Sequence, residues 1–436
     1  MSSLQQNILN FNKSLSYNFE GGNLSSDSGL IIIRSFVEKL GLRPLLEDAF
    51  NDSAYRVHTY ASIIEQLVYT IISGYHSDNC SDSLRHDPIF TNILDKEALA
   101  SQPTISRFIN SLDETAIEAF NRLLEILFER ANPKRSTKQI VLDLDSTLFE
   151  TFGTQDKSAY NFHYASKGYH PLMLFNGLNG DLMKIELRGG SVYTSNNIEA
   201  FLKPVLEWLE EAYPNTQILV RADSGFATPA LYNLCEEFGV LFVIRLKANA
   251  TLKKYSEDIL REFEDVYGKD YSKHHVMYDE FPYQAKSWQK PLRVICRIER
   301  SPGELLARAT FIVTSLEAEP KVVVKAYNKR GNMENFIKEA KIDFSMKSAS
   351  HSSFMANTIK CLIKALAYNI VNIMKRTALP KEHQSCRMLS LRTVFIKIAS
   401  RIVTSARRTT FKLSSNYPWM RQFQKIMEKI DKLCFS

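Results

Sequence analysis

The chain has 436 residues, a mass of 50.0 kDa and a net charge of +7, and 44% of its residues are hydrophobic. This length exceeds one ordinary hydrophobic core and predicts two or three domains, while the mixture of apolar and charged residues excludes a disordered protein. The apolar runs are too short to cross a bilayer and the N-terminus shows no signal peptide, so we expect a cytoplasmic protein without a membrane partner. The six cysteines form no C-x-x-C pair and the nine histidines show no ligand spacing, which argues against a zinc knuckle and a disulfide framework.

The first third of the chain is predicted to be helical, with helices at 30–46 and 60–73 and a third that opens at Ser101. In the third helix Ser101 can cap the N-terminus and Pro103 fits the first turn. Two interpretations stay open: this helix belongs to a DNA-binding module, or it packs against the following domain. Its apolar stripe consists of Ile105, Phe108, Ile109 and Leu112, which leaves Arg107 and Asn110 on the other side.

After a linker at 132–137 the pattern changes to strands that alternate with helices. Three short β-prone runs come first, and each of two amphipathic helices then leads into a further strand. This succession is the outline of an RNase H-like fold. The predicted strands are 139–144, 169–178, 184–188, a run at Ile218 and 240–245, and the helices are 197–213 and 229–238.

Three aspartates stand at the ends of two of these strands. Asp143 and Asp145 close the apolar run that begins at Gln139, and Asp223 follows the run Ile218-Leu-Val220. A carboxylate after a buried strand is costly to desolvate unless a cation or a donor offsets the cost. These aspartates are therefore candidates for a metal site.

Positions 251–321 contain three more strand-like runs, at 273–283, 292–299 and 309–315. They lie beyond a minimal RNase H-like core, so we expect a β-rich insertion here.

The stretch 327–341 places charged side chains at helical spacing. Arg330, Glu334 and Lys341 stand at i, i+4 and i+11, which puts all three on one side of a helix. One interpretation is ion pairing alone, with Glu334 paired to Arg330 or Lys338 and contributing a few tenths of a kcal/mol. The other is a functional site that the upstream aspartates complete.

The segment 347–412 is strongly basic, since Glu382 is its only carboxylate. Such a run repels itself unless an anion lies against it, and nucleic acid is the natural candidate. The alternative is a solvated helical face. The amphipathic run 389–403 and a final helix at 419–433 form either subunit contacts or intramolecular core. The cations are Lys347, Lys360, Lys364, Lys375, Arg376, Lys381, Arg387, Arg392, Lys397, Arg401, Arg407, Arg408 and Lys412.

These motifs together resemble the DDE transposases of bacterial insertion sequences, in the branch with a Y-x2-R-x3-E-x6-K signature (transposase DDE domain group 1). The signature is complete here as Tyr327, Arg330, Glu334 and Lys341. An Asp-Ser-Thr strand end and an Arg-Ala-Asp-Ser-Gly-Phe strand end precede it. The resemblance covers positions 100–345 well and the two ends poorly.

The resemblance implies an α/β protein whose RNase H-like catalytic core carries Asp145, Asp223 and Glu334 as catalytic metal ligands. The family pattern places the acid two residues before threonine, which selects Asp145 and leaves Asp143 as a supporting residue behind the ligands. The cofactor is expected to be Mg²⁺, with Mn²⁺ able to substitute, because hard cations prefer a few carboxylates, water and phosphate oxygens. Two such ions suit phosphodiester cleavage and strand transfer.

Four further residues are expected to contact DNA. By resemblance, Arg330 and Lys341 reach phosphates beside the cleaved bond, and Tyr327 positions a flanking phosphate or a flipped nucleotide. In the family the β-rich insertion helps to clamp the DNA end. Trp288, which lies beside Lys286 and Lys290, either stacks on an unpaired base or packs within a small sheet.

The expected partners are double-stranded DNA, as terminal inverted repeats and target DNA, and a second copy of the chain when the protein assembles on DNA, in the nucleoid. The leading hypothesis is a transposase that binds these repeats, cleaves the ends and joins them to target DNA. The alternatives are an RNase H-like nuclease without strand transfer and a catalytically silent DNA-binding regulator. The expected domains are a helical DNA-binding domain at 1–131, the core at 132–250 and 322–375, the β-rich insertion at 251–321, and a basic helical region at 376–436.

Overall fold

The computed structural model describes residues 7–51 and 56–435, which form two compact units. The first unit combines the described residues up to Ser111 with Met374–Phe435, and the second is Leu112–Ile373. The expectation of no signal peptide concerns an N-terminus whose residues 1–6 lie outside the described part of the chain. No helix in that part has the length and apolar content needed to cross a membrane.

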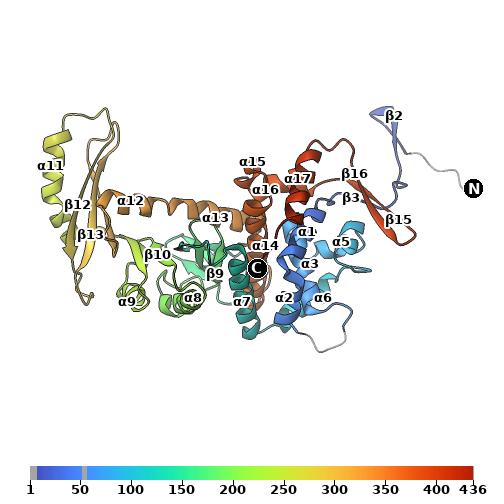
Figure 1. Cartoon of the computed structure of the whole chain (residues 1–436), viewed down its shortest axis with the longest axis horizontal. Coiled ribbons are helices and arrows are strands. Elements are labelled where there is room, and N and C mark those ends of the chain that lie inside the picture. Colours follow the sequence, from blue (N-terminus) through green and yellow to red (C-terminus); the bar gives the residue numbers. More distant parts are fainter. Residues whose placement is uncertain (1–6, 52–55, 436) are drawn as a thin grey trace, which may run out of the picture. The chain divides into compact units, whose positions relative to one another are not determined.

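The first unit is built mainly from helices that come from both ends of the sequence (Figure 1). Its N-terminal elements are β1 (Asn7–Leu9), β2 (Asn12–Tyr17), β3 (Leu24–Ser25), α1 (Leu30–Leu40), α2 (Leu42–Ala49), α3 (Tyr60–Ser73), α4 (Cys80–Ser83), α5 (Pro88–Ile93) and α6 (Gln102–Ser111). Its C-terminal elements are α15 (Lys381–Gln384), α16 (Met388–Leu391), a π-helical turn η2 (Arg392–Ile396), β15 (Ser400–Ser405), β16 (Arg408–Leu413) and α17 (Met420–Asp431).

Local signals fix the ends of the first helices. Helix α3 has the predicted bounds because the Thr59 side chain accepts a hydrogen bond from the Ser62 amide at 3.2 Å and Gly74 ends the helix in a left-handed conformation. The helix predicted at 30–46 is instead two helices. Gly41, at φ 67°, ends α1 and begins α2, because glycine adopts this conformation without a Cβ penalty.

Strands occur in two places that the sequence analysis assigned to helix. Before residue 30 the described chain forms β1, β2 and β3, and the amphipathic run 389–403, within the region 376–436 that was predicted to be helical, ends in β15. The second prediction was wrong because the β-branched residues Ile402, Val403 and Thr404 favour an extended chain that can pair with Thr409 and Thr410. The region 376–436 is thus basic but only partly helical.

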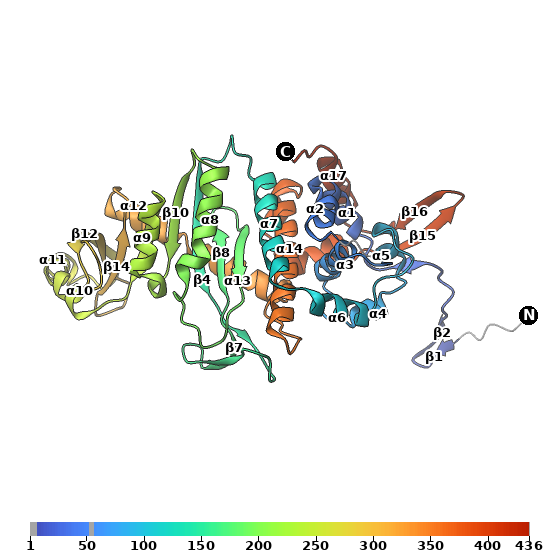
Figure 2. The same cartoon turned by 90° about the horizontal axis from the view of Figure 1, so that it is seen from below.

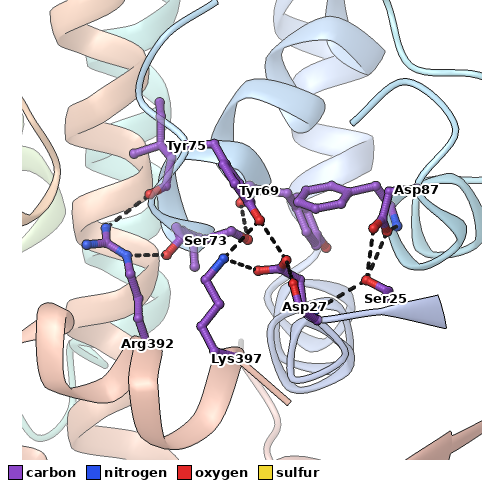
Figure 3. A network of polar contacts seen from close by, with 12 residues as sticks. Ser25, Asp27, Tyr69, Ser73, Tyr75, Asp87, Arg392 and Lys397 are labelled. Atoms are coloured by element: carbon purple, nitrogen blue, oxygen red, sulfur yellow. Dashed lines mark hydrogen bonds and ion pairs between the residues drawn. The ribbon is translucent and has the colours of Figure 1, made fainter. Parts of the chain in front are cut away.

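A polar network joins the two ends of the sequence within the first unit (Figure 3). Asp27, which is 1% exposed, accepts hydrogen bonds from Lys397 Nζ at 2.5 Å and from the Tyr75 hydroxyl at 2.8 Å. Lys397 also donates to the Tyr75 hydroxyl at 3.0 Å and lies over its ring. Arg392 donates to the backbone carbonyls of Ile71 and Ile72. These contacts fix the C-terminal segment to α3.

Lys397→Met is expected to lower the free energy of unfolding by about 2 kcal/mol, because it leaves the Asp27 carboxylate buried without its cation. The effect is smaller than for a fully buried pair because the Lys397 side chain is 36% exposed. Thermal and urea unfolding measure it. The same substitution at the exposed Lys425 of α17 is the matched control. Equal stability of the two variants would show that the Asp27–Lys397 pair does not stabilise the unit.

The second unit contains one large mixed sheet with helices on both faces (Figure 2). Its strands are β4 (Gln139–Ser146), β5 (Phe149–Glu150), β6 (Ala159–Asn161), β7 (Ser166–Tyr169), β8 (Leu172–Asn176), β9 (Leu182–Glu186), β10 (Gln217–Ala222), β11 (Leu241–Leu246), β12 (His275–Tyr283), β13 (Leu292–Arg300) and β14 (Arg308–Thr314). Its helices are α7 (Glu114–Ala131), α8 (Ile198–Ala212), η1 (Ser224–Phe226), α9 (Pro229–Glu237), α10 (Ala250–Tyr255), α11 (Glu257–Tyr267), α12 (Pro320–Asn328), α13 (Gly331–Asp343) and α14 (Phe354–Thr377), whose last residues belong to the first unit.

The large sheet has the strand order β12-β13-β14-β11-β10-β4-β8-β9. The predicted meander is present, because β8 pairs antiparallel with both β4 and β9, and β10 runs parallel to both β4 and β11. Side chains alternate between the two faces along β10: Val220 packs in the core with α8 and α9, and Leu219 packs against Val323 and Val324 of α12.

The strands predicted between 251 and 321 are present as β12, β13 and β14, but they do not form a separate small sheet. Strand β14 pairs antiparallel with β11, so the three strands extend the main sheet. Helices α10 and α11, which were not predicted, precede them. Sequence patterns establish strands but leave open which strands pair across a long connection.

Candidate active site

Asp145 and Asp223 occupy equivalent positions on two adjacent parallel strands. The last paired residues of β4 and β10 are Leu144 and Ala222, and each aspartate is the next residue along its strand. Because parallel strands end at the same edge of a sheet, the two carboxylates are neighbours there. Both line a cavity of about 620 Å³, whose wall also includes Tyr164, His170 and Lys247.

Charge repulsion connects Asp145 with two other predicted acids, Asp223 and Glu334. Burial raises the pKa of Asp145 to about 6; Arg330 opposes this rise, and the charges of Asp223 and Glu334 add to it. The two aspartates and burial also raise the pKa of Tyr164 to about 12, with burial as the larger cause. Burial, more than any charged neighbour, thus disfavours the charged form of Asp145.

The predicted signature helix is divided. Tyr327 lies near the end of α12, whereas Glu334 and Lys341 lie on α13, and Lys329 and Arg330 form the turn between the helices. Both turn residues keep right-handed helical dihedrals, and Gly331 is the first residue of α13. The four signature residues nevertheless stay on one continuous segment that runs beside the ends of β4 and β10.

Two signature cations hold α13 against the end of β4. Arg330 Nη2 lies 3.1 Å from Asp145 Oδ2 and donates to the Leu144 carbonyl at 3.0 Å. At the other end of the helix, Lys341 Nζ donates to Thr147 Oγ1 at 2.9 Å. Within the described residues, the buried Nε of Arg330 has no hydrogen-bond partner. This atom is a donor available to an anion at the site.

The other two signature residues differ in exposure. Glu334 is exposed in the first turn of α13. Tyr327 is half-buried, and burial is the main cause of its raised pKa, which Arg330 and Arg245 oppose. Glu334 is therefore not part of the wall of the cavity that Asp145 and Asp223 line.

Asp143 takes part in a buried ion pair beneath the two aspartates. Its Oδ1 and Oδ2 accept from Arg221 Nε at 2.6 Å and Nη2 at 2.7 Å, and both side chains are almost completely buried. Arg221 Nη1 donates to the Ala326 carbonyl of α12 at 2.7 Å. A Cβ at Gly177 would collide with both charged groups, so glycine is required there. Asp143 thus supports the strand ends and fixes the helix that carries Tyr327.

Arg221 and Gly177 were missed in the sequence analysis. Arg221 stands two residues before Asp223, as Asp143 stands two residues before Asp145. Residues two apart on a strand share a face, so this repeated spacing was the signal in the sequence that Arg221 and Asp143 lie together on adjacent strands and can pair. The cavity residues Tyr164 and His170 were also missed; they come from the aromatic stretch around β6, β7 and β8, which shows no such spacing.

The expected divalent cation requires several oxygen ligands that lie close together. In the parts of the chain that the structure describes, no three His, Cys, Asp or Glu side chains lie close enough together to hold a metal ion. Asp145 and Asp223 do share one cavity, and their oxygens are ligands that hard divalent cations prefer. A cation between them would stabilise the charged form of Asp145, which burial disfavours. These two residues therefore fit the expected cofactor, with Glu334 outside such a cluster.

Trp288 does not offer a face for base stacking. Its side chain is 8% exposed and packs edge-to-face against Tyr232 and Tyr283 in the core of the second unit. Its sequence neighbours Lys286 and Lys290 are polar. The Trp288 ring nevertheless lies on the apolar face of the sheet, because burying so large a ring is more favourable than exposing it to water. The packing interpretation of Trp288 is the one that the structure supports.

Comparison with known proteins identifies the family. The transposase DDE domain group 1 family matches residues 7–434, well beyond the 100–345 that the motifs covered. A solved piggyBac transposase synaptic complex with hairpin DNA resembles the chain at 15% sequence identity and a TM-score of 0.41, over 85% of this chain and 80% of that chain. No curated protein matches. Since the family match spans nearly the whole sequence, the chain belongs to the transposase DDE domain group 1 family.

Proposed function

We propose that this transposase binds the terminal inverted repeats of its element, cleaves the DNA ends and joins them to target DNA with Mg²⁺ or Mn²⁺ as cofactor. The observation that supports this most strongly is the pair of carboxylates, Asp145 and Asp223, which follow the last paired residues of adjacent parallel strands and line one cavity. Two acids in this arrangement suit phosphodiester chemistry.

In the proposed reaction Asp145 and Asp223 would hold the divalent cation from the cavity wall, and Glu334 would join them from α13, outside that wall. A bound divalent ion lowers the pKa of an attacking water and stabilises charge on the attacking and leaving oxygens. In cleavage, water attacks phosphorus and the 3′-oxygen leaves as a hydroxyl. In strand transfer, that 3′-hydroxyl attacks a target phosphodiester, and the displaced target oxygen leaves.

The signature cations and Tyr327 are proposed to position the DNA. The unpaired Nε of Arg330 can donate to a phosphate oxygen beside the scissile bond. Lys341, at the end of β4, supplies a second positive charge close to the same strand. Tyr327 contacts a flanking phosphate or a flipped nucleotide. Arg330 then exchanges its contact with Asp145 for a contact with the substrate.

We also propose that β4, β8, β9, β10 and β11 form an RNase H-like core, and that β12, β13 and β14 belong to an insertion that contacts the DNA end. The proposed domains keep the ranges 1–131, 132–250 with 322–375, 251–321 and 376–436. A homodimer assembled on nucleoid DNA brings together the two sites that paired ends require.

An assay of the purified full-length protein with labelled duplexes that carry the DNA ends flanking its gene tests the proposal. With Mg²⁺ or Mn²⁺ we expect end cleavage followed by joined products, and without a divalent ion we expect binding alone. The three candidate functions give different results. Cleavage without joined product would assign a nuclease, and binding without cleavage in either metal would assign a catalytically silent regulator.

A further inference from the structure

Strands β15 and β16 form a two-stranded ribbon that extends beyond the helices of the first unit (Figures 1 and 2). The ribbon consists of residues 400–413 and turns at Ala406, which has φ 53°. At its base β3 pairs with Ser400 and Arg401. Among residues 7–51 and 56–435, no other strand pairs with the rest of the ribbon.

The cross-strand register separates the ribbon into two unlike faces. One face carries the pairs Ile402–Phe411 and Thr404–Thr409, and Ile402 is buried at the base. The other face carries the pairs Arg401–Lys412, Val403–Thr410 and Ser405–Arg408. We call Arg401, Arg408 and Lys412 the cationic face; all three are exposed.

The cationic face has no internal charge compensation. No carboxylate occurs between Glu382 and Glu428 in the sequence. The described residues supply no ion pair or hydrogen bond to any member of the cationic face. Arg401 and Lys412 stand directly opposite each other, and like charges in this position destabilise a strand pair. The ribbon thus keeps two like charges opposite each other, an arrangement that an anion lying against them would relieve.

Other cations of the basic segment 347–412 are accounted for within the fold. Lys364 is 2% exposed and donates to the carbonyls of Ser345 and Ser348, and Arg392 is 7% exposed and donates to carbonyls of α3. Both side chains are buried inside the fold and do not contribute to a charged surface. Arg401, Arg408 and Lys412 differ from these two side chains in being exposed.

We infer that the β15–β16 ribbon binds duplex DNA, with the cationic face against the phosphates and the ribbon in the major groove. Six residues per strand span about 20 Å, and the major groove, about 12 Å wide, admits a two-stranded ribbon. The exposed Thr410 hydroxyl lies among the cations and can donate to a base edge or a phosphate. The inference rests on the proposed function only in taking DNA as the partner.

The test compares two triple variants of the full-length protein by fluorescence anisotropy on a labelled duplex, without divalent metal and over a series of salt concentrations. Arg401→Gln/Arg408→Gln/Lys412→Gln removes the cationic face. We expect affinity to fall on the order of 100-fold at 0.1 M salt and the slope of log K against log salt to decrease by about one unit per lost contact.

The matched control, Arg421→Gln/Lys425→Gln/Lys432→Gln, removes three exposed cations from α17 and the residue that follows it, where Glu428 and Asp431 lie among them. Its affinity is expected to stay within about threefold of the wild type, since it loses net charge but no contact. An equal loss of DNA affinity in the two triple variants, or wild-type affinity of the variant that lacks the cationic face, would overturn the inference.

Lys412→Glu separates binding from folding. Glutamate opposite Arg401 replaces a repulsive pair by an attractive one, so Tm should be equal or higher while DNA affinity falls. Unchanged DNA affinity of this variant would contradict the inference.

The end-cleavage assay distinguishes a failure of the ribbon inference from a failure of the proposed function. A wild type that binds DNA and cleaves none would refute the proposed function alone, and a ribbon triple that binds normally beside an active wild type would refute the ribbon alone.

Discussion

Replacing Asp145 with asparagine is expected to reduce DNA end cleavage on the order of 1,000-fold while DNA binding persists. Asparagine keeps the shape of the side chain but removes the charge that a divalent cation requires, and metal assistance supplies several kcal/mol of the rate acceleration. Asp223→Asn should have the same effect because Asp223 holds the equivalent position on β10. Gel-resolved cleavage and joining of labelled ends measure the activity, and anisotropy measures the binding.

A matched control for these variants is Glu210→Gln, which neutralises an exposed carboxylate on α8 of the same unit. It should keep wild-type cleavage. Glu334→Gln tests the third proposed ligand, which the structure places on α13 outside the cavity wall. Wild-type activity of Asp145→Asn would remove Asp145 from the catalytic site, and wild-type activity of Glu334→Gln alone would leave a site of two aspartates.

Asp143→Ala is expected to lower the free energy of unfolding by about 3–5 kcal/mol, because it leaves the Arg221 guanidinium buried without its carboxylate. For a unit of this size the loss corresponds to a decrease in Tm of roughly 10 °C. The effect differs in kind from that of Asp145→Asn, which removes a charge facing a cavity. Thermal and urea unfolding measure the stability of both variants.

The control for Asp143 removes both partners of the ion pair. Asp143→Leu/Arg221→Met should recover most of the lost stability, since apolar side chains of similar volume can replace a buried pair without an uncompensated charge. The hydrogen bond from Arg221 to the Ala326 carbonyl is lost as well, so α12 is less firmly held and activity stays reduced. A single variant within about 1 kcal/mol of the wild type would show that the pair is not required for folding.

Sequence patterns predicted much of the local structure. The helix predicted at 60–73 has the bounds of α3, and the strands β4, β8, β9, β10 and β11 followed from short β-prone runs. The positions of Asp145 and Asp223 at strand ends followed from the same runs. These features depend on a few neighbouring residues, so a single sequence contains the signal.

Other features could not be predicted because they depend on distant residues. Strand β14 joins the main sheet through β11, far along the chain, and β15 pairs with β3 from the other end of the sequence. The place of Trp288 in the core depends on Tyr232 and Tyr283. No local pattern distinguishes these pairings from others of similar composition.

The sequence by itself determined which residues could form the site: two aspartates after strands, and Arg330, Glu334 and Lys341 on one helical segment. Only the tertiary structure decided how they are used. It placed Asp145 and Asp223 at one sheet edge, set Arg330 against Asp145, and left Glu334 exposed. The physical reason is that strand ends and helical faces follow from local periodicity, whereas proximity of charges follows from which strands pair and how each charge is compensated on burial.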